Sequence, residues 1–179
     1  CLGAAANVFA LESFMDEIAH DRGEDPLAFR LRHLEDPRAR AIVERLGAEM
    51  SRLPPASAFE GRGIGYARYK NAAARVGVGV DLAVDQRGAI VLRRAIIVAD
   101  AGRIVDLAGV EAQLEGGFLQ GASWALHEQV AWERGGITSR DWDSYPVLRF
   151  DNVPRIAVIA LDRPGDEALG GGEASPGPA

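Results

Sequence analysis

The sequence predicts an α+β fold, in which N-terminal helices are followed by a mostly antiparallel sheet that includes a long glycine-rich helix. Three observations support this prediction. Apolar residues recur at helical spacing early in the chain and alternate with small or polar residues over 75–85, and a glycine-rich helix is expected over 107–127.

The helical part is expected over residues 1–52. Apolar side chains recur three or four residues apart over 6–21, which predicts the first helix. Two further helices are each marked by an Asp–Pro pair, Asp25–Pro26 and Asp36–Pro37. Aspartate is a good N-cap, and proline fits the first helical position because its missing N–H is not needed there.

The α+β part is expected over 61–164. Valine and leucine alternate with glycine, alanine and aspartate over 75–85, which predicts a half-buried strand. The polar turn 85–88 leads into an apolar second arm over 89–100, as in a β-hairpin. Further strands are expected for "GIGYARY", "EQVAWE" and "RIAVIALD", with a long aromatic loop between the last two.

The helix expected over 107–127 is unusual for its glycines, which are Gly109, Gly116, Gly117 and Gly121. Each costs about 1 kcal/mol relative to alanine, so we expect another group to pack close to the helix backbone. Gln113 and Gln120 lie seven residues apart on one face, with Gly117 between them. This face suits a polar ligand, although packing on a sheet through small residues explains the pattern equally well.

Composition excludes several classes of protein. The net charge of −6 argues against nucleic-acid binding, and no apolar run approaches the roughly 18 residues of a membrane span. Cys1 is the single cysteine, so no internal disulfide or multi-cysteine metal cluster is expected. The three histidines lie far apart in the sequence, so no metal-ligating side chains are expected either.

The C-terminal segment 165–179 carries the candidate catalytic residue. Glu173 follows three glycines in "LGGGEASPGPA", a stretch without lysine or arginine. Glycines allow the backbone to approach a bulky cofactor, and a carboxylate placed there would act as a general base. The alternative is a solvated turn that contains an acid.

Five segments, taken in order, resemble the molybdopterin-binding large subunits of the xanthine dehydrogenase/aldehyde oxidase family. They are "LGAAANVFALESFMDEIAHDRGEDPLAFRLRHLEDPRARAIVERL", "GRGIGYARYKN", "ADAGRIVDLAGVEAQLEGGFLQGASWALHE", "WDSYPVLRFDNVP" and "LGGGEASPGP". The resemblance covers essentially the whole chain and points to the bacterial subfamily of isoquinoline 1-oxidoreductase and nicotinate dehydrogenase. It implies a piece of the second molybdenum-cofactor domain, incomplete at both ends.

The resemblance implies a molybdenum hydroxylase that inserts water-derived oxygen into a C–H bond of an N-heterocycle or an aldehyde. The implied cofactor is molybdenum–molybdopterin, as the cytosine dinucleotide. The implied partners are the rest of the large subunit and a small subunit whose [2Fe–2S] clusters accept the electrons. The bacterial cytoplasm and the periplasm are both compatible with the sequence.

The resemblance also assigns the site. Glu173 matches the glycine-loop glutamate that accepts a proton during oxygen insertion, and Gln113 matches the cofactor-contacting glutamine of the glycine-rich helix. Further cofactor contacts are expected from Leu2, Gly3, Gly117, Gly171 and Gly172. One departure from the family's pattern is Asp106–Leu107, where relatives usually have Asn–Pro.

Two other functions stay open. A non-catalytic assembly module would bind an iron–sulfur partner without activity of its own, although the intact Gly–Gly–Glu loop and Gln113 argue against degeneration. A CO dehydrogenase-type enzyme depends on a cysteine loop that lies outside this chain.

Overall fold

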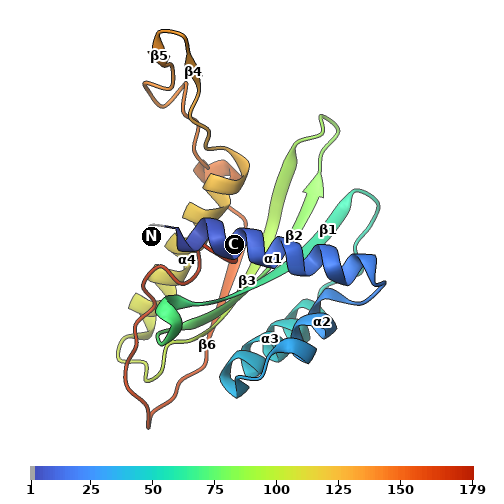
Figure 1. Cartoon of the computed structure of the whole chain (residues 1–179), viewed down its shortest axis with the longest axis vertical. Coiled ribbons are helices and arrows are strands. Elements are labelled where there is room, and N and C mark those ends of the chain that lie inside the picture. Colours follow the sequence, from blue (N-terminus) through green and yellow to red (C-terminus); the bar gives the residue numbers. More distant parts are fainter. Residues whose placement is uncertain (1–2) are drawn as a thin grey trace.

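The structure, a computed structural model, describes residues 3–179 and places helices on both faces of a four-stranded sheet (Figure 1). This confirms the predicted α+β class. In chain order the elements are α1 (Ala4–Asp21), α2 (Pro26–His33), α3 (Pro37–Met50), β1 (Glu60–Arg68), η1 (Tyr69–Asn71), β2 (Arg75–Val84), β3 (Ile90–Asp100), α4 (Leu107–Leu126), β4 (Trp132–Glu133), β5 (Gly136–Ile137), η2 (Phe150–Asn152) and β6 (Arg155–Ala160).

The starts of α2 and α3 follow the prediction. The Asp25 carboxylate accepts a hydrogen bond from the Ala28 N–H at 2.9 Å, and the Asp36 carboxylate accepts one from the Arg38 N–H at 2.9 Å. A proline occupies the first turn of each helix. These caps satisfy N–H groups that have no partner inside the helix.

The sheet has the strand order β1–β2–β3–β6. The pairs β1–β2 and β2–β3 are antiparallel, as expected, but β6 pairs with β3 in parallel. The chain leaves β3, returns along α4 and enters β6 in the same direction as β3, and such a crossover connection yields a parallel pair.

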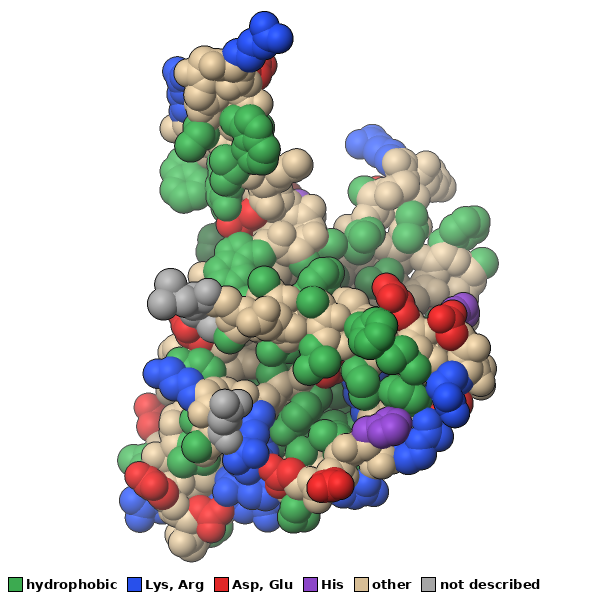
Figure 2. Space-filling view, in the orientation of Figure 1, with side chains coloured by type: hydrophobic (Ala, Val, Ile, Leu, Met, Phe, Trp, Pro, Cys, Tyr) green, Lys and Arg blue, Asp and Glu red, His purple; other side chains and the backbone are tan. Residues whose placement is uncertain are grey.

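The prediction of a strand over "EQVAWE" is wrong in its extent. Only β4 forms there, and its partner β5 lies in the segment expected to be a loop. The two make a small hairpin on an arm that projects from the body (Figure 1). Apolar side chains gather on this arm and along α1 (Figure 2), and Trp132 on the arm is 73% exposed.

The base of the arm is fixed by Glu128 rather than by strand pairing. Its carboxylate accepts hydrogen bonds from the Ser123 hydroxyl at 2.6 Å and the Tyr145 hydroxyl at 2.8 Å. Ser123 lies on α4, so the arm is tied to the glycine-rich helix.

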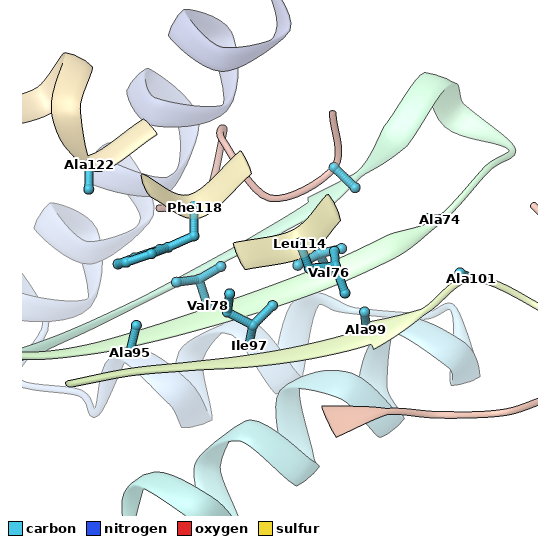
Figure 3. Close-up of a cluster of buried hydrophobic side chains, with 11 residues drawn as sticks. Ala74, Val76, Val78, Ala95, Ile97, Ala99, Ala101, Leu114, Phe118 and Ala122 are labelled. Atoms are coloured by element: carbon cyan, nitrogen blue, oxygen red, sulfur yellow. The ribbon is translucent and has the colours of Figure 1, made fainter. Parts of the chain in front are cut away.

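The main core lies between α4 and the sheet. Leu114 and Phe118 of α4 pack over Val76, Val78 and Ile97 of the strands (Figure 3). All five are at most 1% exposed. Burial of each such side chain stabilises the fold by about 1.5–3 kcal/mol, so this layer fixes α4 on the sheet.

The first half of β2 is buried on both faces, which corrects the prediction of a half-buried strand. On its second face, a Cβ at Gly77 would lie 2.9 Å from Ile42 Cγ2, and one at Gly79 would lie 2.6 Å from Met50 Sδ. The alternating glycines therefore allow α3 to lie directly on the sheet.

A buried ion pair lies against the free edge of β1 and provides a partner for one of its backbone N–H groups. Arg30 of α2 is 3% exposed, and its Nε donates to Glu12 Oε2 of α1 at 2.8 Å. The same carboxylate oxygen accepts a hydrogen bond from the Tyr66 N–H of β1 at 2.9 Å. Burial alone would lower the pKa of Arg30, but the carboxylates of Glu12 and Asp16 raise it above its ordinary value.

A second polar centre lies at the C-terminal end of β3. The fully buried Asp100 accepts hydrogen bonds from both Arg38 and Arg163, and from the Gly102 N–H at 3.0 Å. Burial alone would raise the pKa of Asp100, but these hydrogen bonds outweigh it and hold the pKa below its ordinary value of 3.8. Asp100 thereby joins α3, β3 and the segment after β6.

Residues 170–179, which we name the docked loop, lie along α4. The Ser175 hydroxyl donates to the Leu114 carbonyl at 2.8 Å. A Cβ at Gly117 would lie 2.3 Å from Ser175 Oγ, and one at Gly121 would lie 2.5 Å from the Pro176 carbonyl oxygen. This confirms that another group packs close to the helix backbone, and the group is the docked loop.

We predict that Gly117→Ala lowers the free energy of unfolding by about 1–3 kcal/mol because the new methyl group displaces the docked loop. Gly116→Ala is the matched control. It meets no atom within 4 Å and gains up to about 1 kcal/mol of helix propensity. Denaturant unfolding of both variants measures the difference, and equal stabilisation by both would contradict the proposed docking.

We also predict that Asp100→Asn destabilises the protein at pH 7 by about 1–3 kcal/mol, because the charge-assisted hydrogen bonds from the partly exposed Arg38 and Arg163 lose their buried carboxylate. A lowered folded-state pKa contributes stability above the unfolded pKa, and this contribution is lost as pH falls through the folded value. The difference between wild type and variant should therefore shrink below about pH 4. Unfolding curves at pH 7 and pH 3 test this, and a constant difference would refute it.

Candidate functional site

The chain leading into the docked loop is held by the turn that follows β3. The Leu169 N–H donates to the Ala101 carbonyl at 2.9 Å, and the Arg103 N–H donates to the Glu167 carbonyl at 3.2 Å. Gly102 has φ +72°, and a Cβ there would lie 2.0 Å from the Glu167 carbonyl oxygen. Glycine is required at this crossing, and the loop is anchored before it reaches α4.

One hollow, which we name the Gln113 hollow, opens between the start of α4, the turn after β3 and the loop glycines, with a volume of about 350 Å³. Gln113 Nε2 donates to the Gly172 carbonyl at 3.3 Å. A Cβ at Gly171 would lie 3.4 Å from Gln113 Cγ. The Gln113 side chain is exposed and lines this hollow, so it is accessible to a ligand there.

The start of α4 forms the opposite wall of the Gln113 hollow. The Asp106 carboxylate caps the helix by accepting a hydrogen bond from the Gly109 N–H at 3.1 Å. Asp106 therefore provides the helix start where relatives are expected to have Asn–Pro. Within residues 3–179, no group of three His, Cys, Asp or Glu is placed to hold a metal ion.

Glu173 lies in a second hollow, on another side of the docked loop. This Glu173 hollow has a volume of about 360 Å³ and is bounded by the N-terminal turns of α1, the end of β1 and η1. Arg68 and Lys70 line it together with the Asn7 side chain of α1. The sequence around Glu173 contains no basic residue, but the fold brings two to the same hollow.

Tyr69 connects the Glu173 hollow to the docked loop. Gly172 has φ +49°, and a Cβ there would lie 2.8 Å from Tyr69 Cε1, so the tyrosine ring packs against the backbone next to Glu173. Lys70 Nζ lies 5.3 Å from the centre of that ring. Lys70 itself has φ +46° and ψ 32°, a left-handed conformation that costs a lysine roughly 1–2 kcal/mol.

Neither Tyr69 nor Lys70 was predicted from the sequence as a site residue. Their signal lay in "GIGYARYKN", where strand alternation stops and an aromatic and a basic residue stand side by side. Ser175 was also missed, because a serine in a loop has no pattern that indicates a buried hydrogen bond. Each of these residues gains its role from a contact with a distant part of the chain.

The structure gathers some expected site residues and separates others. Gln113, Gly171 and Gly172 meet in the Gln113 hollow. Gly117 is covered by Ser175 and Pro176 of the docked loop rather than open to a ligand.

The remaining expected residues, Leu2 and Gly3, precede α1 in the sequence. Gly3 lines a third hollow, with Phe9 and Trp124 among its walls. Leu2 lies outside the described residues.

Comparison with known proteins agrees with this architecture. The sequence model of a family described as the molybdopterin cofactor-binding domain matches residues 33–154. This range covers β1, β2 and β3 of the sheet and the glycine-rich helix that positions Gln113.

Two curated relatives match nearly all of the chain. A nicotinate dehydrogenase subunit of Pseudomonas putida is 37% identical over 97% of this chain and 16% of its own length. The beta subunit of isoquinoline 1-oxidoreductase from Brevundimonas diminuta is 35% identical over 95% of this chain and 22% of its own length. The chain thus spans about a fifth of these relatives.

A solved structure shows the same fold. Aldehyde oxidoreductase from Desulfovibrio gigas superimposes with a TM-score of 0.78 over 98% of this chain and 37% of its own, at 12% identity.

None of the helices within residues 3–179 is long and apolar enough to cross a membrane. On the family match and the two relatives, the chain belongs to the molybdopterin cofactor-binding domains of the xanthine dehydrogenase/aldehyde oxidase family.

Proposed function

We propose that this chain supplies the catalytic base and part of the cofactor contact of a molybdenum hydroxylase that oxidises N-heterocycles or aldehydes. The observation that carries the proposal is the Gln113–Gly172 hydrogen bond, which joins the glycine-rich helix to the residue next to Glu173. The hydrogen bond thereby ties the amide of Gln113 on α4 to the loop that carries the Glu173 carboxylate.

The Gln113 hollow fits a polar organic cofactor. Its walls offer the Gln113 amide and the backbone of Gly170, Gly171 and Gly172, where absent side chains leave room for a close approach. When bound, molybdopterin would supply the oxygen-transfer and two-electron redox chemistry. The residues that would hold it are Gln113, Gly171 and Gly172, with Leu2, Gly3 and Gly117 as further candidates. The cytosine dinucleotide form is part of the proposal.

Glu173 would act as the general base. Conversion of a C–H bond and water into C–OH releases two electrons and two protons, and Glu173 would take up one of these protons at its carboxylate. The Tyr69 ring and the docking of Ser175 on α4 restrict the loop that carries Glu173. A base that is held in place avoids the entropy loss of being ordered during the reaction.

The electrons require an acceptor. We propose that they pass to [2Fe–2S] clusters on a small partner subunit, and that the rest of the large subunit completes the cofactor site. Two facts support these partners. The matched relatives are named as subunits, and this chain corresponds to only 16% and 22% of their lengths.

We predict that Glu173→Gln in the complete enzyme lowers kcat by about 10²–10⁴-fold, because the amide cannot accept the proton. The same substitution at Glu167, an exposed residue six positions earlier, serves as the control and should leave kcat unchanged. Turnover of isoquinoline, nicotinate and simple aldehydes provides the measurement. Full turnover by Glu173→Gln would remove Glu173 as the base.

We predict that Gln113→Ala lowers the molybdenum content of the purified protein, because it deletes the amide that faces the Gln113 hollow. Gln120→Ala is the control, since Gln120 is exposed two helical turns further along α4. Elemental analysis of both variants gives the result. Equal molybdenum content in both would argue against cofactor contact at Gln113.

The same analysis separates the hydroxylase from the non-catalytic module. A module of that kind would co-purify with an iron–sulfur partner but contain no molybdenum. A complex that holds molybdenum and oxidises a heterocycle excludes it.

A further inference from the structure

A row of charged side chains crosses the sheet on the face that α3 covers. Asp81 of β2 lies opposite Arg62 of β1 and opposite Arg94 of β3. Arg94 in turn lies opposite Arg155 of β6. Side chains that are directly opposite on neighbouring strands share a face. A Cβ at Gly79, two residues before Asp81, would meet α3, and residues two apart in a strand also share a face.

A β-bulge brings a further guanidinium group to this row. The pairing of β2 with β3 shifts by one residue after Asp81, so Arg93 has no residue opposite it on β2. In a regular strand Arg93 and Arg94 would point to opposite faces, but here both line one hollow. Bulges re-aim side chains in this way. The hollow has a volume of about 330 Å³, and we name it the arginine hollow after its lining residues, Asp81, Arg93, Arg94 and Arg155.

Two carboxylates at this row are already committed to guanidinium groups. Asp81 Oδ1 lies 3.1 Å from Arg62 Nε, and the Asp81 side chain is 10% exposed. Glu60 of β1 forms an ion pair with Arg93. These two pairs neutralise Arg62 and Arg93 but leave the other two arginines of the row.

Arg94 and Arg155 lie directly opposite each other across β3 and β6. Within residues 3–179 neither of them forms an ion pair, although Asp and Glu outnumber Lys and Arg by 26 to 20 in the sequence. Like charges that are directly opposite destabilise a strand pair. Arg94 is half-buried, so water screens this repulsion only in part. An anion bound between the two guanidinium groups would offset the repulsion.

We propose that the arginine hollow binds a phosphoryl group between Arg94 and Arg155. Its lining carries three guanidinium groups and one carboxylate, which gives a formal sum of +2. Including Arg62 and Glu60, the ion-pair partners outside the lining, leaves this sum unchanged. A phosphoryl group carries about −1.5 to −2 charges at pH 7 and three acceptor oxygens, whereas a carboxylate carries a single charge. Each guanidinium can donate two parallel hydrogen bonds to phosphate oxygens.

The arginine hollow is separate from the proposed cofactor contacts. Gln113 belongs to α4, which packs on the other face of the sheet over Val76 and Val78. Binding in the arginine hollow therefore requires neither the cofactor nor the proposed base. Arg155 is exposed, so the hollow is open to a ligand from solution. Inorganic phosphate and a nucleotide share the phosphoryl chemistry, and the experiment distinguishes these two sources.

The test is titration calorimetry on the complete protein in phosphate-free chloride buffer. Inorganic phosphate, adenosine monophosphate and the dicarboxylate succinate are titrated into wild type and three variants. Arg155→Gln removes one of the two opposed charges at an exposed position. Arg155→Lys keeps the charge but loses the planar fork. Arg87→Gln, in the exposed turn 85–88, is the control.

We expect wild type and Arg87→Gln to bind phosphate equally well. Arg155→Gln should bind it on the order of tenfold more weakly or worse, because charge-assisted hydrogen bonds are lost, and Arg155→Lys should lie between. Without phosphate, Arg155→Gln should unfold at no lower temperature than wild type, because the substitution relieves the repulsion between Arg94 and Arg155. Tighter binding of adenosine monophosphate than of phosphate would support a nucleotide as the source, and equal or weaker binding would support free phosphate.

Two results would overturn the site itself. They are the absence of phosphate binding to wild type, and equal phosphate affinity in wild type and Arg155→Gln. A lower unfolding temperature of phosphate-free Arg155→Gln would contradict the repulsion on which the inference depends. Succinate bound as tightly as phosphate would overturn the choice of a phosphoryl group in favour of carboxylates.

Discussion

The candidate site depends on the close approach of the docked loop to α4. Gly117 and Gly121 leave a groove on the helix, and Ser175 and Pro176 fill it at distances where no Cβ would fit. The buried hydrogen bond from Ser175 to the Leu114 carbonyl fixes the register of loop against helix. Because Glu173 is only two residues from Ser175, any change that lifts the loop from the helix also moves the proposed base.

The same loop is coupled to the stability of the sheet. Its approach begins at Gly102, which crosses the backbone of Glu167, and the Gly102 N–H is bonded to the buried carboxylate of Asp100. Asp100 in turn binds Arg38 of α3 and Arg163 of the segment after β6. Helix docking, strand pairing and the position of the loop therefore share one polar network that is centred on the buried Asp100 carboxylate.

The docked loop also divides the site into two environments. On one side the Gln113 hollow offers amides and bare backbone, which suit a polar organic cofactor. On the other side the Glu173 hollow offers a carboxylate, two basic side chains and an aromatic ring. Gly172 and Glu173 are adjacent in the chain but line different hollows, so a single short loop borders both.

The sequence alone determined the helix starts at Asp25 and Asp36, the β2–β3 hairpin and the glycine-rich helix. It also determined the resemblance that identifies the family. These features depend on capping residues, periodicity and motifs, which involve residues close together in the chain. Only the tertiary structure decided that α3 packs directly on Gly77 and Gly79, that β6 runs parallel to β3, and that β4 pairs with β5. It also decided that Gly117 receives Ser175 and that Lys70 joins Glu173. Each of these contacts joins segments that are far apart in the chain. A local pattern of residues therefore does not indicate which distant segment packs against a given glycine.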